Sequence, residues 1–159
     1  MVELDVLRQV LAAMIEKAWE VYETSAENYA VTRGPRRGLA VVTVQDDTDP
    51  DVWLSLESRF GGLCWGQPKS QNGRDIDLGV SNDGLAHGKI AYCRRTGNNS
   101  GADVRDVRGA ESYWQGALFS EDHKALFAFS GFSETDDVLV AAHGKALYEK
   151  LAVLTPAPR

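Results

Sequence analysis

The segment 125-ALFAFSGFSETDDVLVAAHGKAL-147 shows most clearly how the chain is organised. Its apolar run stops at Ser130-Gly131, and a pattern with helical spacing follows. Ser133 is placed to cap that helix, with Asp136 where a capping box usually has Glu or Gln. The carboxylates of the first turn also complement the positive helix terminus: Glu134, Asp136 and Asp137. The segment predicts a strand followed by a capped helix over 134–154.

Neither serine of this corner fits a catalytic motif. A hydrolase nucleophile elbow requires Gly-x-Ser-x-Gly between a strand and a helix. Ser130 is preceded by Ala128 and Phe129, with Ala128 where the first glycine should be, and Thr135 stands where the glycine after Ser133 should be. The GxxxxGK[ST] pattern of a phosphate-binding loop is also absent. We therefore interpret the corner as structural, with a ligand role as the less favoured alternative.

Hydrophobic spacing and turn residues predict the other elements. Helices are expected at 3–27 and 82–95, one hairpin from 39–45 and 51–60, and a second from 112–119 and 124–130. Residues 61–80 are rich in glycine and read as a loop with one short strand near 76–80. Gly84 and Gly88 are expected to let the 82–95 helix pack closely on the sheet.

This order predicts an α+β fold in one domain, residues 1–154, with a frayed tail at 155–159. Two hairpins give an antiparallel sheet of about five strands, flanked by helices that include a long N-terminal and a long C-terminal helix. A chain of 159 residues is long enough to bury a single core of this kind.

The composition limits the classes of partner that the chain is expected to bind. With 17 basic and 23 acidic residues the net charge is −6, which argues against a nucleic-acid partner. The sequence has no apolar run near the length of a membrane span and no signal-peptide pattern, so a cytoplasmic protein with no membrane partner is expected. Cys64 and Cys93 lack CxxC spacing; two reduced thiols are expected, with a disulfide between them as the alternative.

The sequence predicts neither catalytic residues nor a metal site. His87 precedes Cys93 by six residues, about 240° of helix rotation, so the two cannot converge on one metal. His123 and His143 are interpreted as structural, His123 in a turn and His143 at the margin of the final helix's apolar face. The acidic turn 46–51 departs from the EF-hand pattern and is interpreted as solvated.

Arginines and aromatic residues are the candidates for ligand binding. Two arginine groups would form an anion-binding face if the fold brought them together: Arg33, Arg36 and Arg37, and Arg94, Arg95, Arg105 and Arg108. The favoured alternative is that each pairs with nearby acids in its own loop. The aromatic residues suit a flat ligand, a subunit interface or the core: Trp53, Phe60, Trp65, Tyr113, Trp114 and Phe119.

The C-terminal half is similar to a known family. The segment 116-GALFSEDHKALFAFSGFSETDDVLVAAHGKAL-147 resembles the closing pattern of the GlcG/HbpS-like haem-degrading-domain family: glycine, polar turn, apolar strand, Ser-Gly, acidic residue, helix. Upstream, 81-SNDGLAHGKIAYCRRTGNNS-100 resembles that family's serine-led helix with its Ala-x-x-Lys-Ala element, which Ile90 interrupts. The family's glycine-rich hairpin and Arg-Met-Asp-Gly-type segment are replaced by 51–80.

The resemblance implies a five-stranded antiparallel sheet flanked by helices and assembly into dimers or larger oligomers. Some members bind haem or corrinoid-related ligands, so haem is a cofactor implied by the resemblance alone. No iron ligand can be matched residue by residue.

Three hypotheses for function follow. The first is a small-ligand-binding or sensory module of GlcG/HbpS-like type, a homo-oligomer that binds a planar ligand through Trp65, His87, Arg94, Tyr113 and Trp114. The second is an enzyme with a dispersed site, such as His87, Arg94 and Asp83, in a cleft beside the 61–80 loop. The third is a protein-interaction module that uses exposed aromatic residues.

Overall fold

The computed structural model describes residues 4–26, 29, 37–61, 69–71, 74–76, 82–103 and 105–154. The elements in chain order are α1 (Leu4–Thr24), β1 (Leu39–Gln45), β2 (Trp53–Arg59), β3 (Lys69–Gln71), β4 (Arg74–Ile76), α3 (Asn82–Thr96), β5 (Ala117–Phe119), β6 (Ala125–Ser130) and α4 (Glu134–Leu154). The predicted α+β class is confirmed, and the predicted bounds of β1 and α4 agree with the structure. The expected frayed tail lies outside the described residues.

The main sheet has four strands in the order β2-β1-β6-β5, each antiparallel to its neighbour. The prediction of about five strands is therefore one too high for this sheet. Within the described parts of the 61–80 region, β3 and β4 pair with each other as a separate two-stranded sheet. The chain has two short strands there, where one was expected near 76–80, of which residues 77–80 are outside the described part.

The strand expected at 112–119 begins only at Ala117. The Ser112 N–H donates to the Gly88 carbonyl at 3.0 Å, so this end of the segment is attached to α3 rather than to β6. Gly116 has φ 121°, a conformation that interrupts an extended strand. A Cβ on Gly88 would lie 2.8 Å from the Ala110 carbonyl oxygen, so the missing side chain lets the loop before β5 approach α3 closely. The prediction from the sequence, in contrast, is that this glycine lets α3 approach the sheet.

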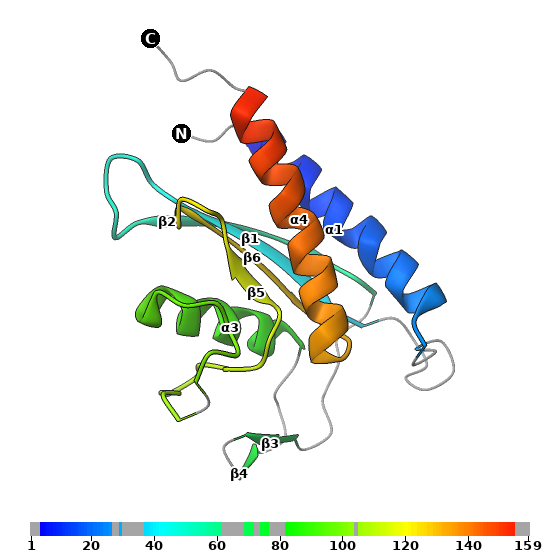
Figure 1. Cartoon of the computed structure of the whole chain (residues 1–159). Coiled ribbons are helices and arrows are strands. Elements are labelled where there is room, and N and C mark those ends of the chain that lie inside the picture. Colours follow the sequence, from blue (N-terminus) through cyan, green and yellow to red (C-terminus); the bar gives the residue numbers. More distant parts are fainter. Residues whose placement is uncertain are drawn as a thin grey trace.

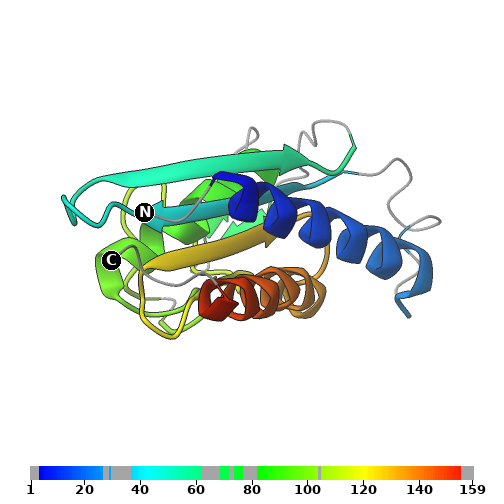
Figure 2. The same cartoon turned by 90° about the horizontal axis from the view of Figure 1, so that it is seen from above.

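Helices cover both faces of the sheet. α1 and α4 lie side by side on one face and α3 lies on the other (Figures 1 and 2). β1 and β6 are buried on both faces, which explains their almost uninterrupted apolar sequences. Side chains alternate between the two layers, with Val42 and Phe127 in the core under α1 and α4, and Val41 and Leu126 in the core under α3.

The corner between β6 and α4 is a helix cap, as predicted. The Asp136 N–H donates to the Ser133 hydroxyl at 3.3 Å. The capping box is completed through a third residue: the Ser133 N–H donates to the Tyr29 hydroxyl at 2.9 Å, and that hydroxyl donates to the Asp136 carboxylate at 2.6 Å. Tyr29 thereby links the segment after α1 to the start of α4. No helix in the described part of the chain combines the length and apolarity of a membrane span.

Candidate functional site

A row of polar contacts joins α3 to the edge strand β2. The Arg59 guanidinium donates to the Asp83 carboxylate at 2.9 Å, and a His87 ring nitrogen lies 3.0 Å from the Glu57 carboxylate. Farther along the helix, the Arg94 guanidinium lies over the Trp53 ring, 5.0 Å from its centroid. The spacing explains the row, because residues four and seven apart share one face of a helix while alternate residues of a strand share one face of a sheet.

The residues of the dispersed-site enzyme hypothesis all lie in this row. Asp83, His87 and Arg94 each have their own partner on β2, and the eleven steps along the helix from Asp83 to Arg94 span about 16 Å. They are thus brought to one border of the fold, but they do not converge on a single point. The arrangement offers no nucleophile–base pair among them.

The end of the row opens into a hollow of about 500 Å³ between α3 and the β1–β2 hairpin. It is lined by Gln45, Pro50, Asp51, Trp53, Ala91, Arg94 and Arg95. The Gln45 side-chain amide donates to the Pro50 carbonyl at 2.7 Å, which fixes that side of the rim. The lining therefore contains one aromatic residue, two arginines and one aspartate.

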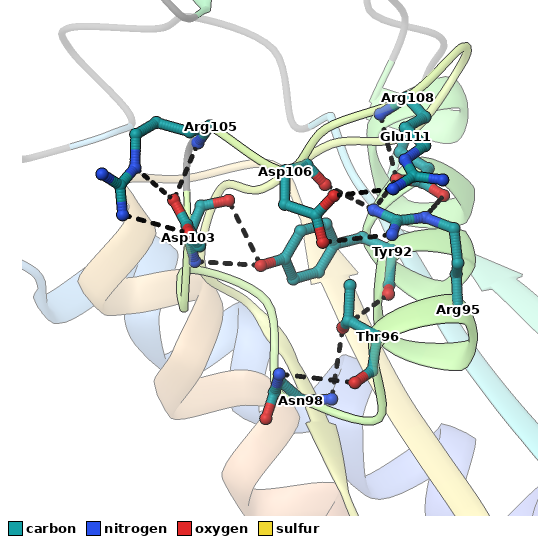
Figure 3. Close-up of polar contacts among 9 residues, drawn as sticks. All are labelled: Tyr92, Arg95, Thr96, Asn98, Asp103, Arg105, Asp106, Arg108 and Glu111. Atoms are coloured by element: carbon teal, nitrogen blue, oxygen red, sulfur yellow. Dashed lines mark hydrogen bonds and ion pairs between the residues drawn. The ribbon is translucent and has the colours of Figure 1, made fainter.

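The two guanidinium groups of the hollow differ in their partners. Arg95 donates to both carboxylate oxygens of Glu111, at 2.6 and 2.8 Å, and to the Asp106 carboxylate at 3.1 Å (Figure 3). Arg94, in contrast, has the ring of Trp53 as its partner and forms no ion pair with the residues that the structure describes. Of the two arginines of the hollow, Arg94 is therefore the one whose exposed guanidinium can bind an added anion.

The other arginines of the loop after α3 follow the favoured alternative. Arg105 pairs with Asp103 at 3.1 Å, and Arg108 lies 3.5 Å from Asp106 (Figure 3). With Arg95 and Glu111 included, three arginines are balanced by three acids inside one segment. Arg33 and Arg36 lie outside the described residues, so the convergence of the two arginine groups stays a prediction.

The Arg95–Glu111 contact predicts a pH-dependent stability. The hydrogen bonds from Arg95 are the largest cause that lowers the pKa of Glu111 below its ordinary 4.5. A carboxyl group with a depressed folded-state pKa stabilises the fold above its unfolded-state pKa, and this stabilisation is lost as the pH falls through the folded-state value. Glu111→Gln should therefore lower the denaturation midpoint at pH 7, and the difference from the wild type should shrink below about pH 4.5.

Urea denaturation of both proteins from pH 7 to pH 3 measures this difference. The matched control is Glu121→Gln, because the Glu121 side chain is exposed. A Glu111→Gln deficit that persists unchanged at pH 3 would show that the ionised pair is not its source.

Beneath α3, the fold buries an ion pair that sequence reasoning missed. Lys89 Nζ lies 2.7 Å from the Asp137 carboxylate, and the two side chains are 1% and 5% exposed. Lys89 also donates to the Phe129 carbonyl at 2.8 Å. Burial raises the pKa of Asp137, and the charge of Lys89 opposes that rise. The pair joins α3 to the end of β6 and the start of α4.

The Asp137 carboxylate also organises the Ser-Gly corner. Its other oxygen accepts from the N–H groups of Gly131 and Phe132, at 3.1 and 2.9 Å. The corner therefore holds an inward-facing carboxylate, where the sequence predicted only a group complementing the helix terminus. The helical position of Lys89 in the 82–95 pattern was visible, but its long-range partner was not.

Tyr113 and Trp114 are not among the residues that line the hollow. Tyr113 and Trp114 lie in the segment before β5, with ring centroids 6.3 Å apart, and that segment meets α3 through Ser112 and Gly88. Trp65 lies outside the described residues. The structure thus brings Arg94 and His87 together along one border of α3, and it places Trp53, which was considered but not chosen, in the wall of the hollow.

The histidines and the described cysteine have local roles. His123 stacks on Phe119 with centroids 4.6 Å apart. His143 is exposed, so its prediction at the margin of an apolar face is wrong: the buried stripe of α4 passes through Val140, Gly144 and Tyr148. Cys93 is a free thiol, and burial raises its pKa to about 12. In the described part of the chain no three His, Cys, Asp or Glu side chains are grouped to hold a metal.

Comparison with protein-family models, curated proteins and solved structures returned no match. The resemblance to the GlcG/HbpS-like family therefore stays an expectation. Function has to be inferred from the geometry of the α3–β2 border.

Proposed function

We propose that this protein is a small-ligand-binding module that binds a planar anionic molecule in the hollow between α3 and the β1–β2 hairpin. The observation that carries the proposal is the placement of Arg94 over the Trp53 ring in the wall of that hollow. The Arg94 guanidinium, which lies over Trp53 and has no acidic partner in the described chain, is a planar cation on which an aromatic carboxylate can stack and with which it can pair. This site retains Arg94 from the predicted set and replaces the other residues by Trp53, Gln45 and Asp51.

The charge balance around the hollow supports an anion of limited size. Arg95 is held by two carboxylates, so Arg94 supplies the positive charge. Asp51, on the hairpin side, favours a ligand that presents a hydrogen-bond donor away from its own carboxylate. Specificity for a planar acid with a distal polar group follows from this pairing.

Haem, the cofactor implied by the family resemblance, does not fit the lining of this hollow. The lining residues contain no histidine, methionine, cysteine or tyrosine to provide an axial ligand. His87, the nearest predicted candidate in the row, already contacts Glu57. The proposed ligand is therefore an organic anion bound by stacking and charge.

Titration calorimetry with 2-naphthoate tests this proposal, with Arg94→Gln as the diagnostic variant. The wild type should bind with a Kd on the order of 1 mM, the range that a ligand of this size reaches. Arg94→Gln should weaken binding about tenfold or more, because a charged hydrogen bond contributes about 1.5–3 kcal/mol. The neutral analogue 2-naphthylmethanol should bind the wild type about as weakly as 2-naphthoate binds Arg94→Gln.

Arg105→Gln is the matched control, since Arg105 is an exposed arginine of the same region that pairs with Asp103. It should bind 2-naphthoate like the wild type. An equal loss of affinity in both variants would show that the protein's net charge, and not Arg94 itself, determines binding. An unchanged Kd in Arg94→Gln would show that 2-naphthoate does not bind at the proposed site.

A further inference from the structure

The outer edge of the sheet at β2 is open. β2 is the terminal strand of the main sheet (Figure 2), and in the described part of the chain it pairs with β1 alone. An edge of seven residues presents a row of unpaired backbone donors and acceptors. Natural sheets commonly protect such an edge with lysine, proline or a bulge. β2, with the sequence WLSLESR, has no lysine or proline, and its register with β1 runs without a bulge. Its two charged residues, Glu57 and Arg59, contact His87 and Asp83 of α3.

The hydrogen bonds to β1 fix which backbone groups face outward. The Asp46 N–H donates to the Val52 carbonyl, and the Phe60 N–H donates to the Gly38 carbonyl, each at 2.9 Å. Because antiparallel hydrogen-bonded pairs alternate along a strand, the even-numbered residues of β2 direct their backbone groups to β1. Trp53, Ser55, Glu57 and Arg59 therefore present N–H and C=O groups at the free edge.

The side chains along this edge are exposed and apolar at its beginning. Val52 and Leu54 are 51% and 50% exposed. Leu54 and Leu56 point to the sheet face covered by α1 and α4, where Leu56 packs against the core. Another β-strand could pair with the free backbone groups of this edge and bury its exposed leucine, whereas water can only hydrate the backbone groups.

We propose that a second copy of this chain occupies this edge, with the two β2 strands antiparallel around Ser55. In that register Leu54 lies opposite the partner subunit's Leu56, and Arg59 lies opposite the partner subunit's Asp51. Both pairs occur twice by symmetry, so an apolar and a charged contact repeat on either side of the axis. The Arg59 guanidinium, which donates to Asp83 within its own subunit, would then lie between two carboxylates. The two four-stranded sheets become one sheet of eight strands.

The sequence of the edge favours this register over its neighbour. Pairing around Leu56 would keep the same outward backbone groups in use, but it would place Leu54 opposite Ser58. It would also place Arg59 opposite Trp53, whose ring is already in contact with Arg94. The register around Ser55 avoids both mismatches and leaves Val52, rather than the central Leu54, opposite Ser58.

Disulfide trapping tests the dimer and its register together. In the Ser55→Cys variant the two Cys side chains face each other in a hydrogen-bonded pair, for which a Cα separation of about 5.5 Å lies within disulfide range. Mild oxidation in a Cys64→Ser background should therefore give a covalent dimer in high yield. Ser58→Cys is the control, because its two copies would be about six residues, roughly 20 Å, apart along the strands.

Sedimentation velocity supplies the second readout. Without any crosslink, the wild type should sediment as a dimer at high concentration, and Ser55→Pro should sediment as a monomer. The Ser55 N–H faces outward, so proline removes an edge donor without removing a bond to β1. Circular dichroism should show that the variant is folded. A wild type that stays monomeric at high concentration, or equal crosslinking of Ser55→Cys and Ser58→Cys, would overturn the proposal.

Discussion

Lys89→Met is expected to lower the free energy of unfolding by about 3–5 kcal/mol. The substitution leaves the Asp137 carboxylate inside the protein without its cation, and a buried charge that has lost its partner is strongly destabilising. It also removes the donor to the Phe129 carbonyl at the end of β6. The loss therefore acts where α3, β6 and α4 meet, and it should appear in the global unfolding transition measured by urea denaturation.

Two further variants separate this effect from a general loss of lysine. Lys124→Met removes an exposed lysine that lies 3.8 Å from Asp47, and it should leave stability almost unchanged because exposed pairs contribute little. Adding Asp137→Asn to Lys89→Met removes the uncompensated charge and keeps an acceptor for the Gly131 and Phe132 N–H groups, so part of the lost stability should return. If Lys89→Met is no more destabilising than Lys124→Met, the pair does not organise this junction.

Gly116→Ala should have the second largest effect, a loss of about 2–5 kcal/mol. Gly116 has φ 121°, which an alanine adopts only with strain. Its Cβ would also lie 2.7 Å from Lys89 Nζ, 2.8 Å from Asp137 Cβ and 2.9 Å from the Phe129 carbonyl oxygen. The estimate combines a backbone cost of about 1–2 kcal/mol with an overpacking cost of about 1–3 kcal/mol.

Gly97→Ala isolates the backbone contribution. Gly97 has φ 71°, and a Cβ there would have no neighbour within 4 Å, so only the conformational cost of about 1 kcal/mol applies. Thermal and urea denaturation of the two variants should differ clearly. Equal stability of Gly97→Ala and Gly116→Ala would show that the buried pair can move away from the added methyl group.

The elements that sequence reasoning located well are those with a strong local signal. β1 has a β-branched apolar run between Gly38 and the 46–50 turn, and α4 has a cap and helical spacing. Both are determined by residues close in sequence, so their bounds were predicted correctly. The strand before β6 was overextended because its first half is held by a bond to α3, a tertiary contact that has no local sequence signal.

The candidate site was predictable only in part, for the same reason. Arg94 and His87 could be selected as polar residues on one helix face, but their partners on β2 depend on how α3 crosses the sheet. Asp137 looked like an ordinary residue of a helix's first turn, and its pairing with Lys89 spans 48 positions. The spacing of acids and arginines between Arg95, in the last turn of α3, and Glu111 did predict their local pairing, because these groups are close in sequence.

The most direct test of the ligand-binding proposal is a titration of the 15N-labelled protein with 2-naphthoate, followed through the indole N–H signals of its tryptophans by NMR. Trp53→Phe assigns the Trp53 signal by its disappearance. We expect a saturable shift of the Trp53 signal, absent in Arg94→Gln, while the Trp19 and Trp114 signals stay in place. A Trp53 signal that does not move while another tryptophan signal shifts would contradict the proposed site.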